Sequence, residues 1–259
     1  LTEADARIVA RASTPISPSS PRVMLNLALG IVLAGVVGVG VIFVLEMLDN
    51  GLHTETDVER QLGLPHIVSV PRLKTGFMGR FSGESVDPGA YVLEKPLSSF
   101  AESFRTIRSA IRLSGVDQDT KVVAVTSALP GDGKTTTSLC LGRVSALAGS
   151  KTIVVDCDLR RRLLTYAICE DAELGLLEVL SGQAVLEDVI QVEEKTGLAI
   201  LPVITPTFTP RDMFDSAAFN AILSQLRDTY DLVVVDTAPV LAVADTRVIA
   251  SRADAVLLA

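Results

Sequence analysis

One glycine-rich stretch of this chain, residues 127–137, has the residue types needed to hold a phosphate group. It has the sequence SALPGDGKTTT, follows an apolar run and precedes apolar residues at helical spacing. A strand, a glycine-rich turn and a helix in this order predict a phosphate-binding loop. Gly131 and Gly133 would let backbone N–H groups face an anion at the positive end of the helix. Lys134 would then neutralise the β- and γ-phosphates, and the Thr135 hydroxyl would face Mg²⁺.

The predicted ligand of this loop is a nucleoside triphosphate. The general pattern of such loops has glycine six residues before the lysine, where this chain has Ala128. The strand–turn–helix context still favours a phosphate loop over a chance match. The residues predicted to bind the nucleotide are Pro130, Gly131, Asp132, Gly133, Lys134, Thr135 and Thr136.

Two acidic motifs follow apolar runs further along the chain. Asp156 and Asp158 follow the run at 152–155, and Asp236 follows the run at 232–235. Strands that are apolar on both faces suit a parallel sheet covered by helices, and ligands bind beyond the carboxyl ends of its strands. These acids could instead cap the next element, but three motifs in this order favour one shared Mg²⁺–nucleotide site. Its expected members are Lys134, Thr135, Asp156, Asp158 and Asp236.

The composition argues against several classes of function. The chain has 259 residues and a net charge of −8, without a basic stripe interleaved with aromatic residues, so a nucleic-acid partner is not expected. His53 and His66 lie outside the predicted nucleotide core, so no histidine-based triad or zinc site is expected. Three cysteines without metal-ligand spacing are predicted to be reduced, buried thiols of a cytoplasmic domain. They are Cys140, Cys157 and Cys169.

An uncharged apolar segment at residues 23–45 predicts a transmembrane helix. At about 1.5 Å per residue it spans roughly 34 Å, enough to cross the hydrocarbon core of a bilayer. A secretory signal peptide would be shorter and would end at a small-residue cleavage site, which the sequence does not show. Local basic residues weakly place the N-terminus in the cytoplasm. The predicted nucleotide domain follows the membrane helix and needs cytosolic ATP, so we expect the C-terminal side to be cytoplasmic in spite of these charges. This orientation implies another membrane span before Leu1, so the chain is expected to be a piece of a longer protein.

The segments beside the predicted membrane helix differ in composition. Residues 12–21 are rich in proline and serine and should be extended. Residues 57–62 are predicted to form a short helix that leads to an extended segment at 66–70. Residues 71–95 combine glycine, proline and charge without a period, and we expect a mobile connector there. Tyr91 falls in this connector.

The remainder of the chain alternates helices and strands. An amphipathic helix is predicted at 95–113, because apolar residues recur there at helical spacing. This order predicts an α/β fold, a P-loop doubly wound parallel sheet flanked by helices and preceded by one transmembrane helix. A further element is expected beyond residue 259. The predicted strands are 121–127, 152–156, 198–203, 232–236 and 255–258, and the predicted helices include 134–148, 174–180 and 219–227.

These motifs resemble those of bacterial tyrosine kinases fused to polysaccharide co-polymerases, which control the chain length and export of capsular polysaccharide or exopolysaccharide. The prolines at 15, 18 and 21 are similar to the co-polymerase signature that precedes a membrane span. Residues 127–136 resemble the phosphate loop of this family, in which alanine at position 128 is ordinary. Residues 154–160 and 233–239 resemble its second and third acidic motifs.

The resemblance changes the interpretation of the helix predicted at 95–113. Taken alone, its charged face would be solvated. In the family a Glu-x-x-Arg-x-x-Arg pattern lies at the subunit interface of a ring, and the matching residues are Glu102, Arg105 and Arg108. Relatives often have Gly-Pro and Asn-Pro after the third strand, where this chain has Ile204, Thr205 and Arg211. The adenine pocket is therefore left unassigned.

The resemblance implies an ATP-dependent protein-tyrosine autokinase that regulates polysaccharide polymerisation and export. It further implies a multi-pass protein of the bacterial inner membrane with its kinase domain in the cytoplasm. The implied partners are other copies in a ring, the export and polymerisation machinery, and a cognate tyrosine phosphatase. The expected division is 1–22 for the periplasmic end of the co-polymerase domain, 23–45 for the membrane helix, 46–94 for a juxtamembrane linker and 95–259 for the kinase domain.

The resemblance also implies roles for the convergent residues. Lys134, Asp156 and Asp158 would be catalytic, with one of the two aspartates accepting the tyrosine proton or completing the metal shell. The residues implied to hold Mg²⁺, directly or through water, are Thr135, Asp158 and Asp236. The family's tyrosine-rich tail is not within these 259 residues, so Tyr91 is the best phosphoacceptor expected here.

Two other functions are compatible with a phosphate loop of this kind. One is a partitioning or septum-site ATPase switch, but such proteins carry a signature lysine where this chain has Leu129. The other is a membrane assembly module whose nucleotide site is vestigial. Phosphotyrosine production would separate the kinase from the switch, and nucleotide hydrolysis would separate both from the vestigial site.

Overall fold

The computed structural model describes residues 20–48, 59–60, 63–73, 86–114, 120–204 and 213–259. These residues fall into two compact units, 1–66 and 67–259, which are described separately. The proline-rich stretch and the short helix predicted at 57–62 lie mostly outside the described residues. The segment predicted to be extended, 66–70, forms neither helix nor strand.

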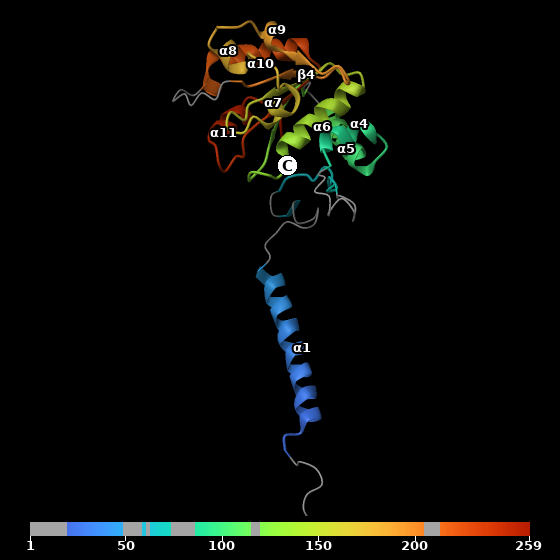
Figure 1. The fold of residues 1–259 in the computed structure, drawn as a ribbon. Coiled ribbons are helices and arrows are strands. Elements are labelled where there is room, and N and C mark those ends of the chain that lie inside the picture. The colour runs from blue at the N-terminus through green and yellow to red at the C-terminus, as the bar shows by residue number, and fades with distance from the viewer. Residues whose placement is uncertain (1–19, 49–58, 61–62, 74–85, 115–119, 205–212) are drawn as a thin grey trace, which may run out of the picture. The chain divides into compact units, whose positions relative to one another are not determined.

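The first unit contains one long helix, α1, which runs from Val23 to Leu48. Figure 1 shows it as a single continuous helix. It has a mean hydropathy of 2.8 in its most apolar window, and none of its side chains is buried. By length and composition α1 can cross a membrane, which confirms the predicted helix and extends it by three residues beyond position 45.

The second unit is built on a sheet whose described strands have the order β3-β4-β2-β5-β1-β6. Neighbouring strands are parallel except β3, which pairs antiparallel with β4. The central strands β2, β5 and β1 are buried along their whole length, as expected for a sheet covered on both faces. The predicted doubly wound fold is confirmed, while the short edge strand β3 was not predicted. The strands are β1 Val122–Thr126, β2 Thr152–Asp156, β3 Gln191–Val192, β4 Ala199–Leu201, β5 Leu232–Asp236 and β6 Ala255–Leu258.

Helices cover both faces of this sheet, so alternate residues of its inner strands enter different cores. In β1, Val122 and Ala124 face one core, and Val123 and Val125 face the other. Figure 1 shows α8, α9 and α10 on one side of the sheet, and α4, α5 and α6 on the other. The helices are α4 Pro88–Glu94, α5 Ser99–Ser114, α6 Lys134–Leu147, α7 Leu163–Ile168, α8 Leu176–Leu180, α9 Leu186–Val189, the 3₁₀ turn η1 Met213–Asp215, α10 Ala217–Thr229 and α11 Asp245–Ala250.

Helix α6 packs closely on the sheet because it carries Gly142 on its inner side. A Cβ atom at this position would lie 2.5 Å from Val154 Cγ2 and 3.1 Å from Leu198 Cδ1, closer than van der Waals contact allows. The missing side chain therefore lets α6 approach β2. This close approach holds the first turn of α6 near the carboxyl ends of β1, β2 and β5.

The structure corrects the prediction of a mobile connector at 71–95, because its last part forms helix α4. Asp87 caps this helix by accepting hydrogen bonds from the Gly89 and Ala90 N–H groups, and Pro88 occupies the first turn. An acidic N-cap followed by proline is a typical helix start, which the composition of the segment obscured. Tyr91 therefore lies on a packed helix, where its ring meets Phe100 edge-on at 5.8 Å.

Candidate nucleotide site

The loop between β1 and α6 has the backbone conformation that an anion site requires. Gly131 and Gly133 have φ angles of 101° and 100°, which side chains other than glycine rarely adopt. The loop is braced at its start, since the Asp132 carboxylate accepts a hydrogen bond of 2.8 Å from the Leu129 N–H group. Helix α6 begins at Lys134 without a side-chain cap, so its first N–H groups and its dipole remain available to a phosphate.

Lys134 forms an ion pair with Asp158, which lies just beyond the end of β2. The Lys134 Nζ to Asp158 Oδ2 distance is 3.0 Å, and both side chains are almost completely buried. Asp158 also accepts hydrogen bonds through Oδ1 from the N–H groups of Arg160 and Arg161. Asp158 therefore both caps the following turn and faces the phosphate loop. The sequence had suggested either a helix cap or a member of the nucleotide site, and this side chain has both positions.

Asp236, at the end of β5, lies beside the first two turns of α6. Its Oδ1 accepts a hydrogen bond of 3.0 Å from the Ser138 hydroxyl. Burial raises the pKa of the Asp236 carboxyl to about 7, the negative charge of Asp156 adds to this rise, and Thr135, Lys134 and Ser138 oppose it. Ser138 was not predicted as a site residue from the sequence, although it follows Lys134 by one helical turn and so lies on the same face of α6.

Three buried oxygen atoms at this place match what Mg²⁺ requires. In the described part of the chain, Thr135 Oγ1, Asp158 Oδ2 and Asp236 Oδ2 are buried and accept no hydrogen bond, and only the Asp158 oxygen is in an ion pair, with Lys134. Thr135 nevertheless lies near enough to Asp236 to lower the pKa of its carboxyl. Hydroxyl and carboxylate oxygens are hard ligands that suit Mg²⁺. Among the described residues, no group of three or more His, Cys, Asp or Glu side chains is placed to hold a metal ion. Such a site fits Mg²⁺, which is commonly held jointly by protein, phosphate and water.

Asp156 differs from the other two aspartates because both of its oxygens are occupied. Oδ1 accepts from the Asp158 N–H group, and Oδ2 accepts from the N–H group and the hydroxyl of Thr165 at 3.1 and 2.7 Å. Burial raises the pKa of the Asp156 carboxyl to about 6, while the Thr165 hydrogen bonds act against this rise. Thr165, which was not predicted from the sequence, donates both of these hydrogen bonds to Asp156 and so anchors α7 to β2.

The structure thus brings together the phosphate loop and the three predicted aspartates. Pro130, Gly131 and Asp132 lie exposed in the turn, and Thr136 lies half-buried in the first turn of α6. The predicted interface residues lie elsewhere, on α5, where Arg105 pairs with Glu102 at 2.9 Å near the surface. The three cysteines are free and buried, as predicted.

The fold and this site define a P-loop nucleotide-binding domain, and comparison with known proteins agrees. A family model described as an AAA domain matches residues 120–259. The chain is 32% identical over 176 residues to tyrosine-protein kinase YwqD of Bacillus subtilis, covering 68% of this chain and 74% of that protein. It is 31% identical over 277 residues to the succinoglycan biosynthesis transport protein ExoP of Rhizobium meliloti, covering 98% of this chain and 35% of ExoP.

Solved structures point to the same group of proteins. The kinase domain of the Escherichia coli tyrosine kinase ETK superposes with a TM-score of 0.71 at 26% identity, covering 80% of this chain and 81% of that one. The chain belongs to the bacterial tyrosine kinase family. It spans about a third of the length of the longer curated relatives that it matches.

Proposed function

We propose that this chain is the membrane helix and catalytic domain of an ATP-dependent protein-tyrosine autokinase that regulates the polymerisation and export of capsular polysaccharide or exopolysaccharide. The observation that carries the proposal is the convergence of Lys134, Asp158 and Asp236 on an uncapped helix N-terminus behind a phosphate loop. Family membership supports the choice of phosphoryl transfer to tyrosine over other uses of this fold.

In this proposal the loop and Lys134 bind and orient the phosphates of ATP. Mg²⁺ supplies positive charge that offsets the charge of the transferring phosphate. Thr135 and Asp236 would hold the metal directly, which their buried oxygens without hydrogen-bond partners support, and Asp158 would contact it through water. Lys134 leaves the Asp158 carboxylate to meet the phosphates, and the Asp158 carboxylate then becomes free to act on the acceptor.

We assign different roles to Asp156 and Asp158 on the basis of their hydrogen bonds, since the sequence alone left these roles open. Asp156 has both oxygens engaged by α7 and by the backbone of Asp158, so it holds these elements in place. Asp158 Oδ2 accepts no hydrogen bond among the described residues and is held only by its ion pair with Lys134, so Asp158 is the better group to accept the proton of the tyrosine hydroxyl. Catalysis by this site is then mostly positioning and electrostatic stabilisation.

The remaining parts of the proposal concern the assembly and its place in the cell. Helix α5 would contribute Glu102, Arg105 and Arg108 to contacts between copies in a ring. The protein would be a multi-pass protein of the bacterial inner membrane, with the catalytic domain in the cytoplasm. Its partners would be the polysaccharide export machinery and a cognate tyrosine phosphatase. The chain would divide into the periplasmic end of a co-polymerase domain at 1–22, the membrane helix at 23–45, a juxtamembrane linker at 46–94 and the kinase domain at 95–259.

The test is phosphoryl transfer by the membrane-inserted protein, supplied with Mg²⁺, γ-labelled ATP and a tyrosine-containing acceptor copolymer. We expect label on tyrosine in the wild type and none with Lys134→Met. Lys151→Met is the matched control, because Lys151 is exposed and its ammonium lies over the Tyr230 ring, away from the loop. Free phosphate without labelled tyrosine would identify an ATPase switch instead. Neither product would indicate an assembly module with a vestigial site.

A further inference from the structure

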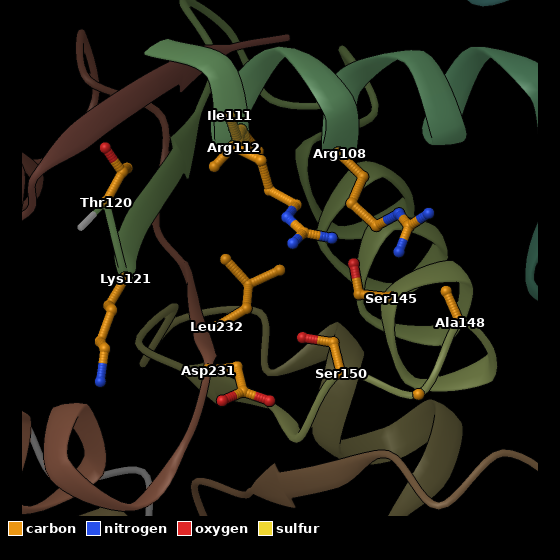
Figure 2. Close-up of a pocket in the computed structure, with 11 residues that line it drawn as sticks. Arg108, Ile111, Arg112, Thr120, Lys121, Ser145, Ala148, Ser150, Asp231 and Leu232 are labelled. Carbon is orange, nitrogen blue, oxygen red and sulfur yellow. The ribbon is translucent and has the colours of Figure 1, made fainter. Parts of the chain in front are cut away.

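A second polar cavity lies at the amino ends of the central strands, whereas the candidate nucleotide site lies at their carboxyl ends. It encloses about 540 Å³, a size that accommodates a small metabolite. Its walls are the last turns of α5, the end of α6 and the residues that lead into β1, β2 and β5. Figure 2 shows the side chains that line it.

Two arginines dominate this cavity. Arg108 and Arg112 are one helical turn apart on α5, and in Figure 2 both side chains extend from that helix towards the space above Ser145 and Leu232. Neither guanidinium is recorded in an ion pair with any carboxylate of the described residues, although other arginines of this unit are paired. The third cation of the wall, Lys121, uses its ammonium to bond the Arg227 carbonyl at 3.0 Å.

Two buried polar atoms of the cavity wall have no hydrogen-bond partner within the described parts of the chain. They are Arg108 Nε and Ser145 Oγ, and both residues line the cavity. Buried polar groups in folded proteins are nearly always satisfied, so such a pair requires an explanation. An oxygen-rich anion seated between α5 and the end of α6 would accept from the arginine and from the hydroxyl.

The geometry of the donors favours a phosphate over a carboxylate. One guanidinium can bind both oxygens of a carboxylate, because the two groups match in shape. Two guanidinium groups with a nearby serine hydroxyl offer more hydrogen-bond donors than a carboxylate has oxygens. A phosphate monoester has three terminal oxygens and about two negative charges. The positive charge of Arg108 and Arg112 therefore fits a phosphate monoester.

Asp231 adds a further requirement at the other side of the cavity. Its Oδ2 accepts a hydrogen bond of 2.8 Å from the Lys151 N–H group, and Oδ1 accepts none from the residues that the structure describes. A carboxylate repels a plain polyanion but accepts hydrogen bonds from hydroxyl groups. A ligand with a phosphate at one end and hydroxyl groups at the other would satisfy both sides.

We propose that this cavity binds a phosphate monoester that bears hydroxyl groups, such as a phosphorylated sugar, with its phosphate on Arg108 and Arg112 and its hydroxyls facing Asp231. The site is separate from the phosphate loop and does not depend on the kinase activity proposed above. Because Arg108 also belongs to the proposed interface of α5, ligand binding at this cavity would bear directly on contacts between copies.

The test is calorimetric titration of the full chain in lipid nanodiscs with glucose 1-phosphate, with Mg²⁺ and excess ADP present to fill the phosphate loop. We expect saturable binding that Arg112→Gln weakens at least tenfold and that Ser145→Ala also weakens. Arg247→Gln on α11 is the matched control and should bind as the wild type does, because this exposed arginine lies outside the cavity. Glucose without phosphate should not bind.

Two results would overturn the proposal. The first is an absence of saturable binding, or equal binding by the wild type and Arg112→Gln, with circular dichroism showing that both are folded. The second is that Arg112→Gln lowers the mass of the oligomer while leaving glucose 1-phosphate binding unchanged. That outcome would mean that the cavity receives an acidic side chain of another protein chain.

Discussion

Lys134 Nζ lies 3.0 Å from Asp158 Oδ2, and the two side chains are 4% and 2% exposed. This pair joins the first residue of α6 to the segment after β2, two elements that would otherwise carry isolated buried charges. A phosphate that binds the loop must therefore compete with a carboxylate for the lysine. The pair holds Lys134 in position in the absence of nucleotide, so that little reordering of its long side chain is needed on binding.

Breaking this ion pair should destabilise the domain. Asp158→Asn removes the ion-pair partner of the buried Lys134 ammonium, and we expect a loss of about 3–5 kcal/mol in the free energy of unfolding. Lys134→Met should lower the free energy of unfolding by a similar amount, because it leaves the buried Asp158 carboxylate without its ion-pair partner. The double variant should recover part of the loss, since neither charge then remains. Urea unfolding followed by far-UV circular dichroism measures all three, and strictly additive losses would contradict the coupling.

A control for this experiment is available elsewhere in the same unit. Arg143 on α6 pairs with Glu193 through two hydrogen bonds in a buried setting, away from the phosphate loop. Arg143→Met should destabilise the domain to a similar extent. At a temperature where this variant is still folded, it should retain tyrosine phosphorylation, whereas Lys134→Met should not.

The stability of the domain without Mg²⁺ should depend on pH through Asp236. Burial raises the pKa of this carboxyl to about 7, from an ordinary value near 4 in the unfolded chain. Between these values the folded state holds a proton that the unfolded state has lost, so stability falls as the pH rises from about 4 to about 7. The asparagine of Asp236→Asn does not titrate, so this pH-dependent contribution to the free energy of unfolding should be missing from the variant.

The comparison that isolates this effect is the difference in unfolding free energy between Asp236→Asn and the wild type at pH 5 and at pH 8. We expect the difference to shift in favour of the variant at pH 8, where the wild type must bury a charged carboxylate. Added Mg²⁺ should reverse the shift, because the metal stabilises the ionised form. A difference that is the same at both pH values would refute the prediction.

The α5 surface should matter more for assembly than for folding. The Arg105–Glu102 pair is 37% and 63% exposed, and exposed pairs of this kind contribute less than about 1 kcal/mol to stability. Arg105→Glu should therefore leave the thermal midpoint nearly unchanged, and we expect it to lower the mass of the oligomer measured by light scattering. Arg247→Glu introduces the same charge change on α11 and should leave the mass unchanged.

Adding a methyl group at Gly142 should disturb the packing of α6. The new Cβ would overlap Val154 and Leu198, whose side chains are fully buried in the sheet and cannot move aside freely. We expect Gly142→Ala to lower the free energy of unfolding by about 1–3 kcal/mol. The same displacement should weaken nucleotide binding, because α6 carries Lys134 and Thr135. A variant as stable as the wild type would show that the sheet can accommodate the methyl group.

Much of the fold could be predicted from the sequence because its signals are local. Strands β2, β5 and β6 have the predicted bounds, since β6 is an apolar run and the apolar runs of β2 and β5 each end at an aspartate. The phosphate loop was predictable because its glycines and lysine are contiguous. Helix α4 was missed because its Asp-Pro start stands in a stretch whose overall composition is typical of a loop.

The tertiary structure decided the relations between residues far apart in the chain. The order of the strands places β5 between β1 and β2, and only this arrangement brings Asp236 to the first turns of α6. The difference between Asp156, bonded to Thr165, and Asp158, paired with Lys134, also depends on where α7 and α6 pack. A sequence states which side chains can bind a phosphate or a metal, because that depends on residue type and local spacing. Which of them meet, and which remain without a partner, is decided by packing across the sheet.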